Sequence, residues 1–126
     1  MSEHDDQAAF VGWCRLMSRC YPGLALIHAI PNGGGRSRRE AGRLKAEGVL
    51  AGVPDLFLPV ARGGYHGLYI ELKRSAVGAA PRGRISRVQA DVMTLLRAQG
   101  YATTVCYGYA EAIAAVERYF TTAREE

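Results

Sequence analysis

The stretch that decides the fold is Gly52-Val53-Pro54-Asp55 followed by a hydrophobic segment that ends in Glu71-Leu72-Lys73. Two apolar runs, residues 56–60 and 68–73, flank a turn and predict a β-hairpin with a long loop. Because side chains alternate faces along a strand, Glu71 and Lys73 point the same way. Asp55 can join them, since paired strands lie about 5 Å apart. One sheet face would then carry two carboxylates and one ammonium, which suffice to hold a divalent metal and position a water.

The remaining segments predict helices on both faces of a sheet. Helices are expected over residues 3–20, 37–47, 85–99 and 109–123, and strands over residues 24–30, 56–60, 68–73 and 101–107. The order α-β-α-β-β-α-β-α predicts an α/β fold with a mixed sheet and a right-handed parallel crossover in its late β-α-β unit. With 126 residues and no internal repeat, the chain is expected to form a single domain over residues 1–126.

Hydrophobic periodicity predicts which helix faces are buried. The expected buried stripes are Phe10, Trp13, Cys14 and Met17 in the first helix, with Asp6 off the stripe; Val88, Val92, Leu95 and Leu96 in the third; and Tyr109, Ile113, Val116 and Phe120 in the last. The second helix has Ser37 as its N-cap, Gly48 just past its end and few apolar residues, so it is expected on the surface. Residues 75–84 predict a mobile loop.

Composition places the chain among cytoplasmic globular proteins with a mild preference for polyanions. The net charge is +4 and the pI about 9.2. The polar, acidic N-terminus does not read as a signal peptide, and no apolar run approaches the ~20 residues of a membrane span. Three cysteines without metal-ligand spacing predict free thiols in a reducing compartment.

The hairpin and its flanks resemble the VRR-NUC domain, a branch of the PD-(D/E)xK nuclease superfamily that includes stand-alone phage and prophage proteins. The resemblance spans about residues 3 to 120 and includes the following segments: His28-Ala29-Ile30-Pro31-Asn32-Gly33-Gly34, Lys45-Ala46-Glu47-Gly48-Val49, Gly52-Val53-Pro54-Asp55, Gly67-Leu68-Tyr69-Ile70-Glu71-Leu72-Lys73, Gln89 and Gly100-Tyr101. It implies a restriction-endonuclease-like fold and metal-dependent hydrolysis of phosphodiester bonds in branched or structured DNA.

The chemistry expected of the hairpin follows from its residue types. Asp55 and Glu71 would bind Mg²⁺, or Mn²⁺, because hard cations prefer oxygen ligands. Lys73 would orient or help deprotonate a water, or stabilise the charge of the transition state. The wider superfamily implies the backbone carbonyl of Leu72 as a further ligand. The alternative is a purely structural role, in which these residues form a cross-strand salt bridge at an exposed strand end.

Three further residues have competing interpretations. Gln89 either contacts the metal site, as the resemblance implies, or completes a capping box with Ser86. Glu3 is the favoured first-helix acid for a second metal ligand, with Asp6 as its rival, and Glu3 could equally be a solvated terminal residue. His28 lies in an apolar strand and is more often a core or edge histidine than a catalytic one.

Basic residues predict the DNA contacts. One group is Arg36, Arg38, Arg39, Arg43 and Lys45, and a second contains Arg82, Arg84 and Arg87. Asn32 and its glycines form either a phosphate-binding turn or a plain turn. Neither basic group is interleaved with aromatic residues, which favours duplex or branched DNA over single strands.

A small nuclease without a separate DNA-binding domain is expected to act as a homodimer, whose two-fold symmetry suits a four-way junction. The rival functions are a flap or sequence-specific nuclease on the same fold, and a DNA-structure-binding accessory protein without catalysis.

Overall fold

A mixed four-stranded sheet forms the centre of the protein. The computed structural model describes residues 2–31, 37–76 and 83–122. Within them the strands lie in the order β1-β2-β3-β4, with β1 (His28–Ala29), β2 (Leu56–Leu58), β3 (Leu68–Lys73) and β4 (Ala102–Tyr107). The first three strands pair antiparallel, and β4 runs parallel to β3. The predicted hairpin and mixed sheet are therefore confirmed.

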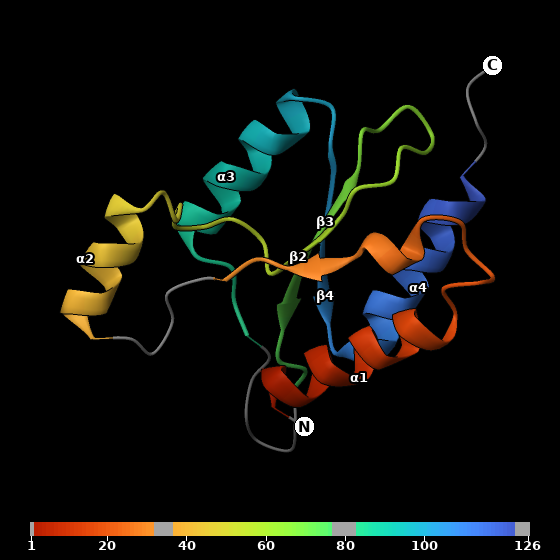
Figure 1. Cartoon of the computed structure of the whole chain (residues 1–126), viewed down its shortest axis with the longest axis horizontal. Coiled ribbons are helices and arrows are strands. Elements are labelled where there is room, and N and C mark those ends of the chain that lie inside the picture. The colour runs from red at the N-terminus through yellow and green to blue at the C-terminus, as the bar shows by residue number, and fades with distance from the viewer. Residues whose placement is uncertain (1, 32–36, 77–82, 123–126) are drawn as a thin grey trace.

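Helices cover both faces of the sheet, as the element order predicts. Figure 1 shows α1 (Glu3–Leu16) and α4 (Tyr109–Thr121) on one side and α3 (Arg87–Ala98) on the other, while α2 (Arg38–Ala46) stands apart. The helices α1 and α4 pack against each other and against β3, whereas α3 packs against β4. The two faces are therefore covered unequally, which leaves room for a site beside α3.

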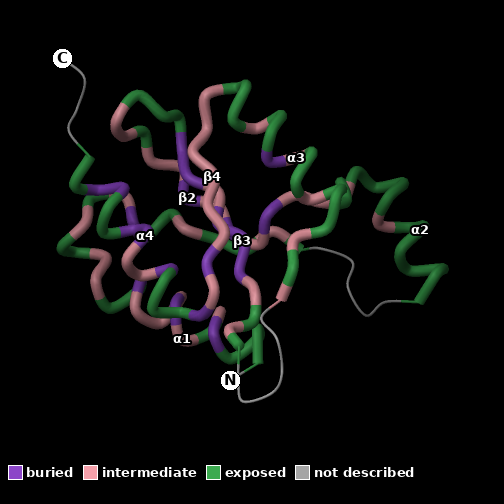
Figure 2. The backbone as a smooth tube through the Cα atoms, turned by 180° about the vertical axis from the view of Figure 1, so that it is seen from behind, coloured by how far each residue is buried: buried purple, intermediate pink, exposed green. Residues whose placement is uncertain are grey.

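The apolar core lies between the sheet and the α1–α4 pair, where Figure 2 shows most of the buried backbone. Alternate residues of β2 and β3 face this core and are buried: Leu56, Leu58, Leu68, Ile70 and Leu72. Phe10 and Val116 meet them from the helices and are fully buried. Because neighbours on a strand face opposite ways, Phe57, Tyr69, Glu71 and Lys73 lie on the other face.

The helix starts form at the residues that the sequence marks. The Ser37 side chain accepts a hydrogen bond from the Glu40 amide at 3.2 Å, and Gly48 has a φ of +105° just past the end of α2. That conformation costs little only for glycine, so it stops the helix. No residue of α2 is buried, which confirms its predicted surface position.

Two element boundaries were predicted wrongly. Residues Leu24–Leu26 form a 3-10 turn, η1, and the first strand has only two residues. Gly23, with a φ of +90°, starts that turn by accepting the Leu26 amide at 3.0 Å. The first helix ends at Leu16 instead of residue 20, because the Cys20 amide bonds to Met17 three residues back and tightens the chain into a turn. Residues 77–82 of the predicted loop lie outside the described part of the chain.

The predicted buried faces of three helices need correction. Asp6 is only 4% exposed although it lies off the apolar stripe of α1. In α3, Val88 and Leu95 are 52% and 67% exposed, and the inward face instead runs through Gln89, Val92, Met93 and Leu96. In α4, Tyr109 is 41% exposed, and the inward residues are Ala112, Ala115, Val116, Tyr119 and Phe120. In α1 and α3, a polar residue takes an inward position because it has a partner there.

Candidate active site

The two carboxyl groups of the hairpin meet on the sheet face that α3 flanks. Asp55 precedes β2, and its Oδ2 accepts the Leu72 amide of β3 at 2.9 Å. Its backbone carbonyl accepts the Ile30 amide at 2.7 Å, so Asp55 is held from both neighbouring strands. Glu71 is 2% exposed, and hydrogen bonding and negative charge from the Asp55 carboxyl are among the causes that raise its pKa. The predicted meeting of Asp55 and Glu71 is thus present in the fold.

Burial is the main reason why Glu71 resists ionisation. It raises the pKa of Glu71 well above its ordinary value, and the hydrogen bond and negative charge of Asp55 raise the pKa further. The Lys73 ammonium lowers the pKa, but less than the other causes raise it. Protonation of Glu71 relieves the repulsion in the metal-free protein, and a divalent cation would relieve the same repulsion between the ionised carboxylates.

Gln89 makes both of the contacts that the sequence left as alternatives. Its Oε1 accepts the Ser86 amide at 2.9 Å, and its own amide donates to Ser86 Oγ at 3.1 Å, which completes the capping box. Its Nε2 donates to Glu71 Oε2 at 3.2 Å. The helix cap therefore holds the Gln89 side chain in the orientation that reaches Glu71.

The acids of α1 occupy different positions. Asp6 Oδ1 accepts the Tyr109 amide at 3.1 Å, so this buried carboxyl caps the start of α4. Glu3 is exposed, and its negative charge adds to the causes that raise the pKa of Glu71. Within residues 2–31, 37–76 and 83–122, no three His, Cys, Asp or Glu side chains are grouped to hold a metal. The fold places Glu3 near the carboxyl pair without making it a third member.

A groove of about 890 Å³ is lined by residues of α2, of the start of α3 and of the segment between α2 and β2 that ends at Asp55. Asp55, Ser86 and Gln89 line it, and Lys45 of α2 lines it from the other helix. Most of its remaining lining is apolar, including Leu44, Val49, Leu50 and Val88. The groove brings the basic helix alongside the candidate site, although α2 is separate from the sheet.

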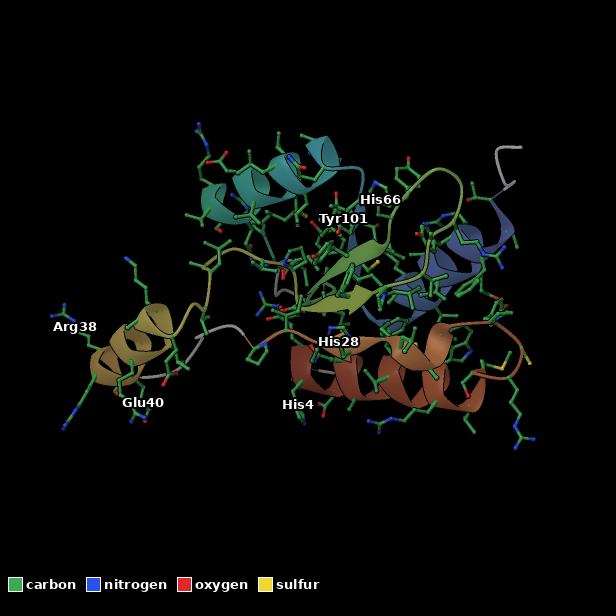
Figure 3. The ribbon with its side chains drawn as sticks, turned by 45° about the horizontal axis from the view of Figure 1, so that its top comes forward. His4, His28, Arg38, Glu40, His66 and Tyr101 are labelled. Atoms are coloured by element: carbon green, nitrogen blue, oxygen red, sulfur yellow. The ribbon has the colours of Figure 1, made fainter. Side chains whose placement is uncertain are left out.

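The predicted DNA-contact residues that the structure describes are exposed. Arg38, Arg39, Arg43 and Lys45 lie on α2, which Figure 3 shows projecting from the molecule with Arg38 pointing outward. Arg84 is exposed before α3, and Arg87 forms an exposed ion pair with Asp91 at 3.3 Å. The predicted contacts Asn32, Arg36 and Arg82 lie outside the described residues.

One residue of this sheet face agrees with the sequence interpretation, which favoured a core or edge histidine, and a second was missed by it. His28 is exposed on an edge strand, and its Nδ1 lies 2.9 Å from the Leu26 carbonyl oxygen. Tyr69 lies two residues before Glu71 on β3 and shares its face. The alternation that groups Glu71 with Lys73 could have identified Tyr69 as well.

Comparison with known proteins identifies the family. The VRR-NUC domain family matches residues 3–110, so the chain belongs to it. A solved structure described as a VRR_NUC domain protein is 28% identical, with a TM-score of 0.77, and the alignment covers 100% of this chain and 93% of that chain. No curated protein matches the sequence closely.

Family membership defines the general function. VRR-NUC proteins are nucleases, so the chain has a nuclease-type function directed at DNA, and the family suggests dependence on a divalent metal. Among the helices of the described ranges, none has the length and apolar character needed to cross a bilayer.

Proposed function

We propose that the protein is a divalent-metal-dependent endonuclease that hydrolyses phosphodiester bonds in branched or structured DNA. The observation that carries this proposal is the buried Glu71 carboxyl in contact with Asp55 and Gln89, with Lys73 on the same sheet face. A buried carboxyl beside a second carboxyl has an unfavourable charge state unless a proton or a cation is present. A nuclease site makes use of that arrangement.

Hard oxygen ligands favour Mg²⁺ or Mn²⁺, and the donors of this site fit such an ion. Asp55, Glu71 and the backbone carbonyl of Leu72 would hold it, with Glu3 as an outer ligand. When bound, the metal supplies charge neutralisation at the phosphate and lowers the pKa of a coordinated water.

The protein's own groups supply the rest of the mechanism. Gln89 fixes one oxygen of Glu71 through its 3.2 Å hydrogen bond, and the Leu72 amide fixes one oxygen of Asp55. The outward lone pairs of both carboxylates therefore keep a defined direction. Lys73 orients the attacking water, assists its deprotonation or stabilises the phosphorane-like charge in the transition state.

Exposed cations of α2 and Arg84 would hold the DNA by its phosphates. Phosphate contacts position a duplex without reading its sequence, which suits a structure-directed enzyme. Lys45 lies on the groove that ends at Asp55, so a strand bound along α2 leads to the carboxyl pair.

Cleavage assays test the proposal directly. Linear, flapped and four-way DNA would be incubated with the protein in Mg²⁺, Mn²⁺ or EDTA, and cleavage of structured DNA is expected only with metal. Asp55→Asn and Lys73→Ala should abolish or strongly reduce cleavage while leaving DNA binding in EDTA intact. Binding without metal-dependent cleavage would favour an accessory protein, and normal cleavage by either variant would refute the assigned roles.

We also propose a homodimer acting on four-way junctions, with one site per scissile strand. A two-fold symmetric pair matches the two symmetric strands of such a junction. Sedimentation with and without junction DNA measures the assembly, and paired incisions are the expected product. A monomer that makes single, unpaired incisions would contradict this part of the proposal.

A further inference from the structure

Five rings form a continuous row on the sheet face that carries the candidate site. The row consists of His28, Phe57, Tyr69, Tyr101 and His66. Phe57 and Tyr69 stack at 4.3 Å between ring centroids, with an interplanar angle of 24°. Tyr101 meets Tyr69 at 5.4 Å and Phe57 at 5.8 Å, and His28 and His66 close the two ends at 5.8 Å from Phe57 and Tyr101.

Strand register makes this aromatic row continuous with the catalytic residues. His28 pairs with Phe57, and Phe57 pairs with Tyr69. Tyr69 precedes Glu71 by two residues on β3, about 7 Å along the strand. Since α3 packs against β4, at the other edge of the sheet, it leaves the β1–β2 side of this face without a packed helix among the described elements.

The row remains accessible along its length. His28 and His66 are exposed, and Phe57, Tyr69 and Tyr101 are only half-buried. Figure 3 shows Tyr101 beside His66 and places His28 across the strands from them. Within the described residues, the hydroxyls of Tyr69 and Tyr101 make no hydrogen bond to protein, whereas the Tyr119 hydroxyl donates to the Val60 carbonyl.

We propose that the aromatic row binds unpaired nucleotides of the DNA substrate by stacking, next to the scissile phosphate. This inference rests on the proposed nuclease function and specifies which part of the substrate the site takes. Bases in a duplex hide their faces in the stack, while unpaired bases expose them to aromatic rings. The row contains no Lys or Arg, so its rings are suited to binding bases. The cations of α2 are suited to binding the phosphates of the paired region.

The basic segments of the sequence do not indicate this aromatic surface, and the fold explains why. The aromatic residues that a single-strand binder needs are absent from the arginine-rich segments. They come instead from β1, β2, β3 and the segments just before β3 and β4, which the sheet brings together. The substrate expected from the complete site is therefore a branch point at which a duplex meets unpaired nucleotides, as when base pairs open at the centre of a four-way junction.

Fluorescence of 2-aminopurine tests the proposal without requiring cleavage. The probe would be placed at successive positions of a single-stranded arm beside a duplex, and titrated with protein in EDTA. Quenching confined to the nucleotides nearest the duplex is expected with the wild-type protein. Tyr69→Leu should weaken binding of the armed DNA about tenfold, within the range for loss of one base–aromatic stack, and leave binding of the blunt duplex unchanged. Tyr69→Phe should retain most of the affinity.

Two controls distinguish stacking from damage to the fold. Tyr65→Leu removes an exposed tyrosine that contacts Tyr119 outside the row, and it should change neither affinity. His28→Ala alters an exposed end of the row and should weaken arm binding in the same direction as Tyr69→Leu. Equal affinities of wild type, Tyr69→Leu and His28→Ala for armed DNA would overturn the proposal, as would equal losses for armed and blunt DNA.

The outcomes separate this inference from the proposed function. Arm-specific quenching without any metal-dependent cleavage supports the aromatic row and refutes the nuclease reaction. Cleavage that is indifferent to an unpaired arm, with no quenching, supports the nuclease and refutes the row.

Discussion

Glu71 has a carboxyl group that is buried beside a second carboxyl, so its ionisation destabilises the metal-free protein. Its pKa rises from 4.5 to about 9 on folding. When folding raises the pKa of a carboxyl group, the folded protein has the full stabilisation below the pKa of the unfolded state. That stabilisation is lost as the pH rises through the pKa of the folded state. We therefore expect the melting temperature in EDTA to fall between about pH 5 and pH 9, and Glu71→Gln to reduce this fall. Differential scanning fluorimetry across the pH series measures both.

Adding a divalent metal should reverse the loss of stability that ionised Glu71 causes. Binding to the folded state alone raises stability with ligand concentration, so Mg²⁺ should raise the melting temperature of the wild-type protein at pH 8 and have little effect on Glu71→Gln. Glu117→Gln, at an exposed carboxylate of α4, is the matched control and should keep the wild-type pH dependence. An identical response of Glu71→Gln and the wild type to both pH and Mg²⁺ would contradict the assigned environment of Glu71.

The double role of Gln89 can be separated by two substitutions. Ser86→Ala removes the side-chain cap of α3 and should lower the free energy of unfolding by about 1 kcal/mol. Gln89→Glu keeps an oxygen for the Ser86 amide but loses the Nε2 donor to Glu71. A hydrogen bond to a charged group contributes about 1.5 kcal/mol or more, so cleavage should fall about tenfold.

Urea unfolding and single-turnover cleavage give the two readouts for this pair. We expect Ser86→Ala to affect mainly stability and Gln89→Glu mainly cleavage. If both variants lose stability and activity in the same proportion, the capping contact and the Glu71 contact do not act separately.

At the scale of the element, α3 shows how one polar side chain with a buried partner changes which face of a helix is buried. The apolar residues alone favour a stripe through Val88, Val92 and Leu95, but Val88 and Leu95 are exposed. The observed inward face starts at Gln89 and continues three, four and seven residues later, at Val92, Met93 and Leu96. A hydrophobicity pattern assigns glutamine to solvent, so it cannot place a helix whose first inward residue bonds a buried carboxyl.

The basic helix α2 should contribute affinity that depends on salt but not on sequence. Arg38→Ala combined with Arg39→Ala removes two exposed cations from it. Each lost phosphate contact should reduce the slope of log affinity against log salt by about 1 for duplex DNA. Fluorescence anisotropy over a salt series, with several unrelated duplexes in EDTA, measures the slope.

An equal charge change on another element provides the control for α2. Arg15→Ala with Arg19→Ala removes two exposed cations, one in the last turn of α1 and one in the turn after it, and Figure 1 places this end of α1 across the molecule from α2. This variant should keep the wild-type slope. Equal slope changes in the two double variants would show that net charge, and not α2, determines the salt dependence.

For the molecule as a whole, contacts that follow from one strand pairing or from the family resemblance were predictable, and contacts that depend on packing between other distant segments were not. The grouping of residues on the hairpin could be predicted because strand alternation places Glu71 and Lys73 on one face, and the pairing of two strands brings Asp55 to them. The cap from Asp6 to Tyr109 spans 103 positions, and the aromatic row joins rings from separate elements. No local period encodes such contacts, because they arise only when the sheet assembles and the helices pack on it.

The core beneath the site should protect two of the three thiols in the native protein. Cys14 of α1 and Cys106 of β4 are buried, and burial raises the pKa of their thiols to about 12 and about 11. Thiolate is the reactive form, so neither should react quickly at neutral pH, while Cys20 is exposed. We expect Ellman's reagent to label one thiol per chain rapidly in buffer and three in denaturant. Cys20→Ser should remove the rapid phase. Rapid labelling of Cys14 or Cys106, identified by peptide mass mapping, would show that the α1–α4 layer opens and does not hold β3 firmly in the folded state.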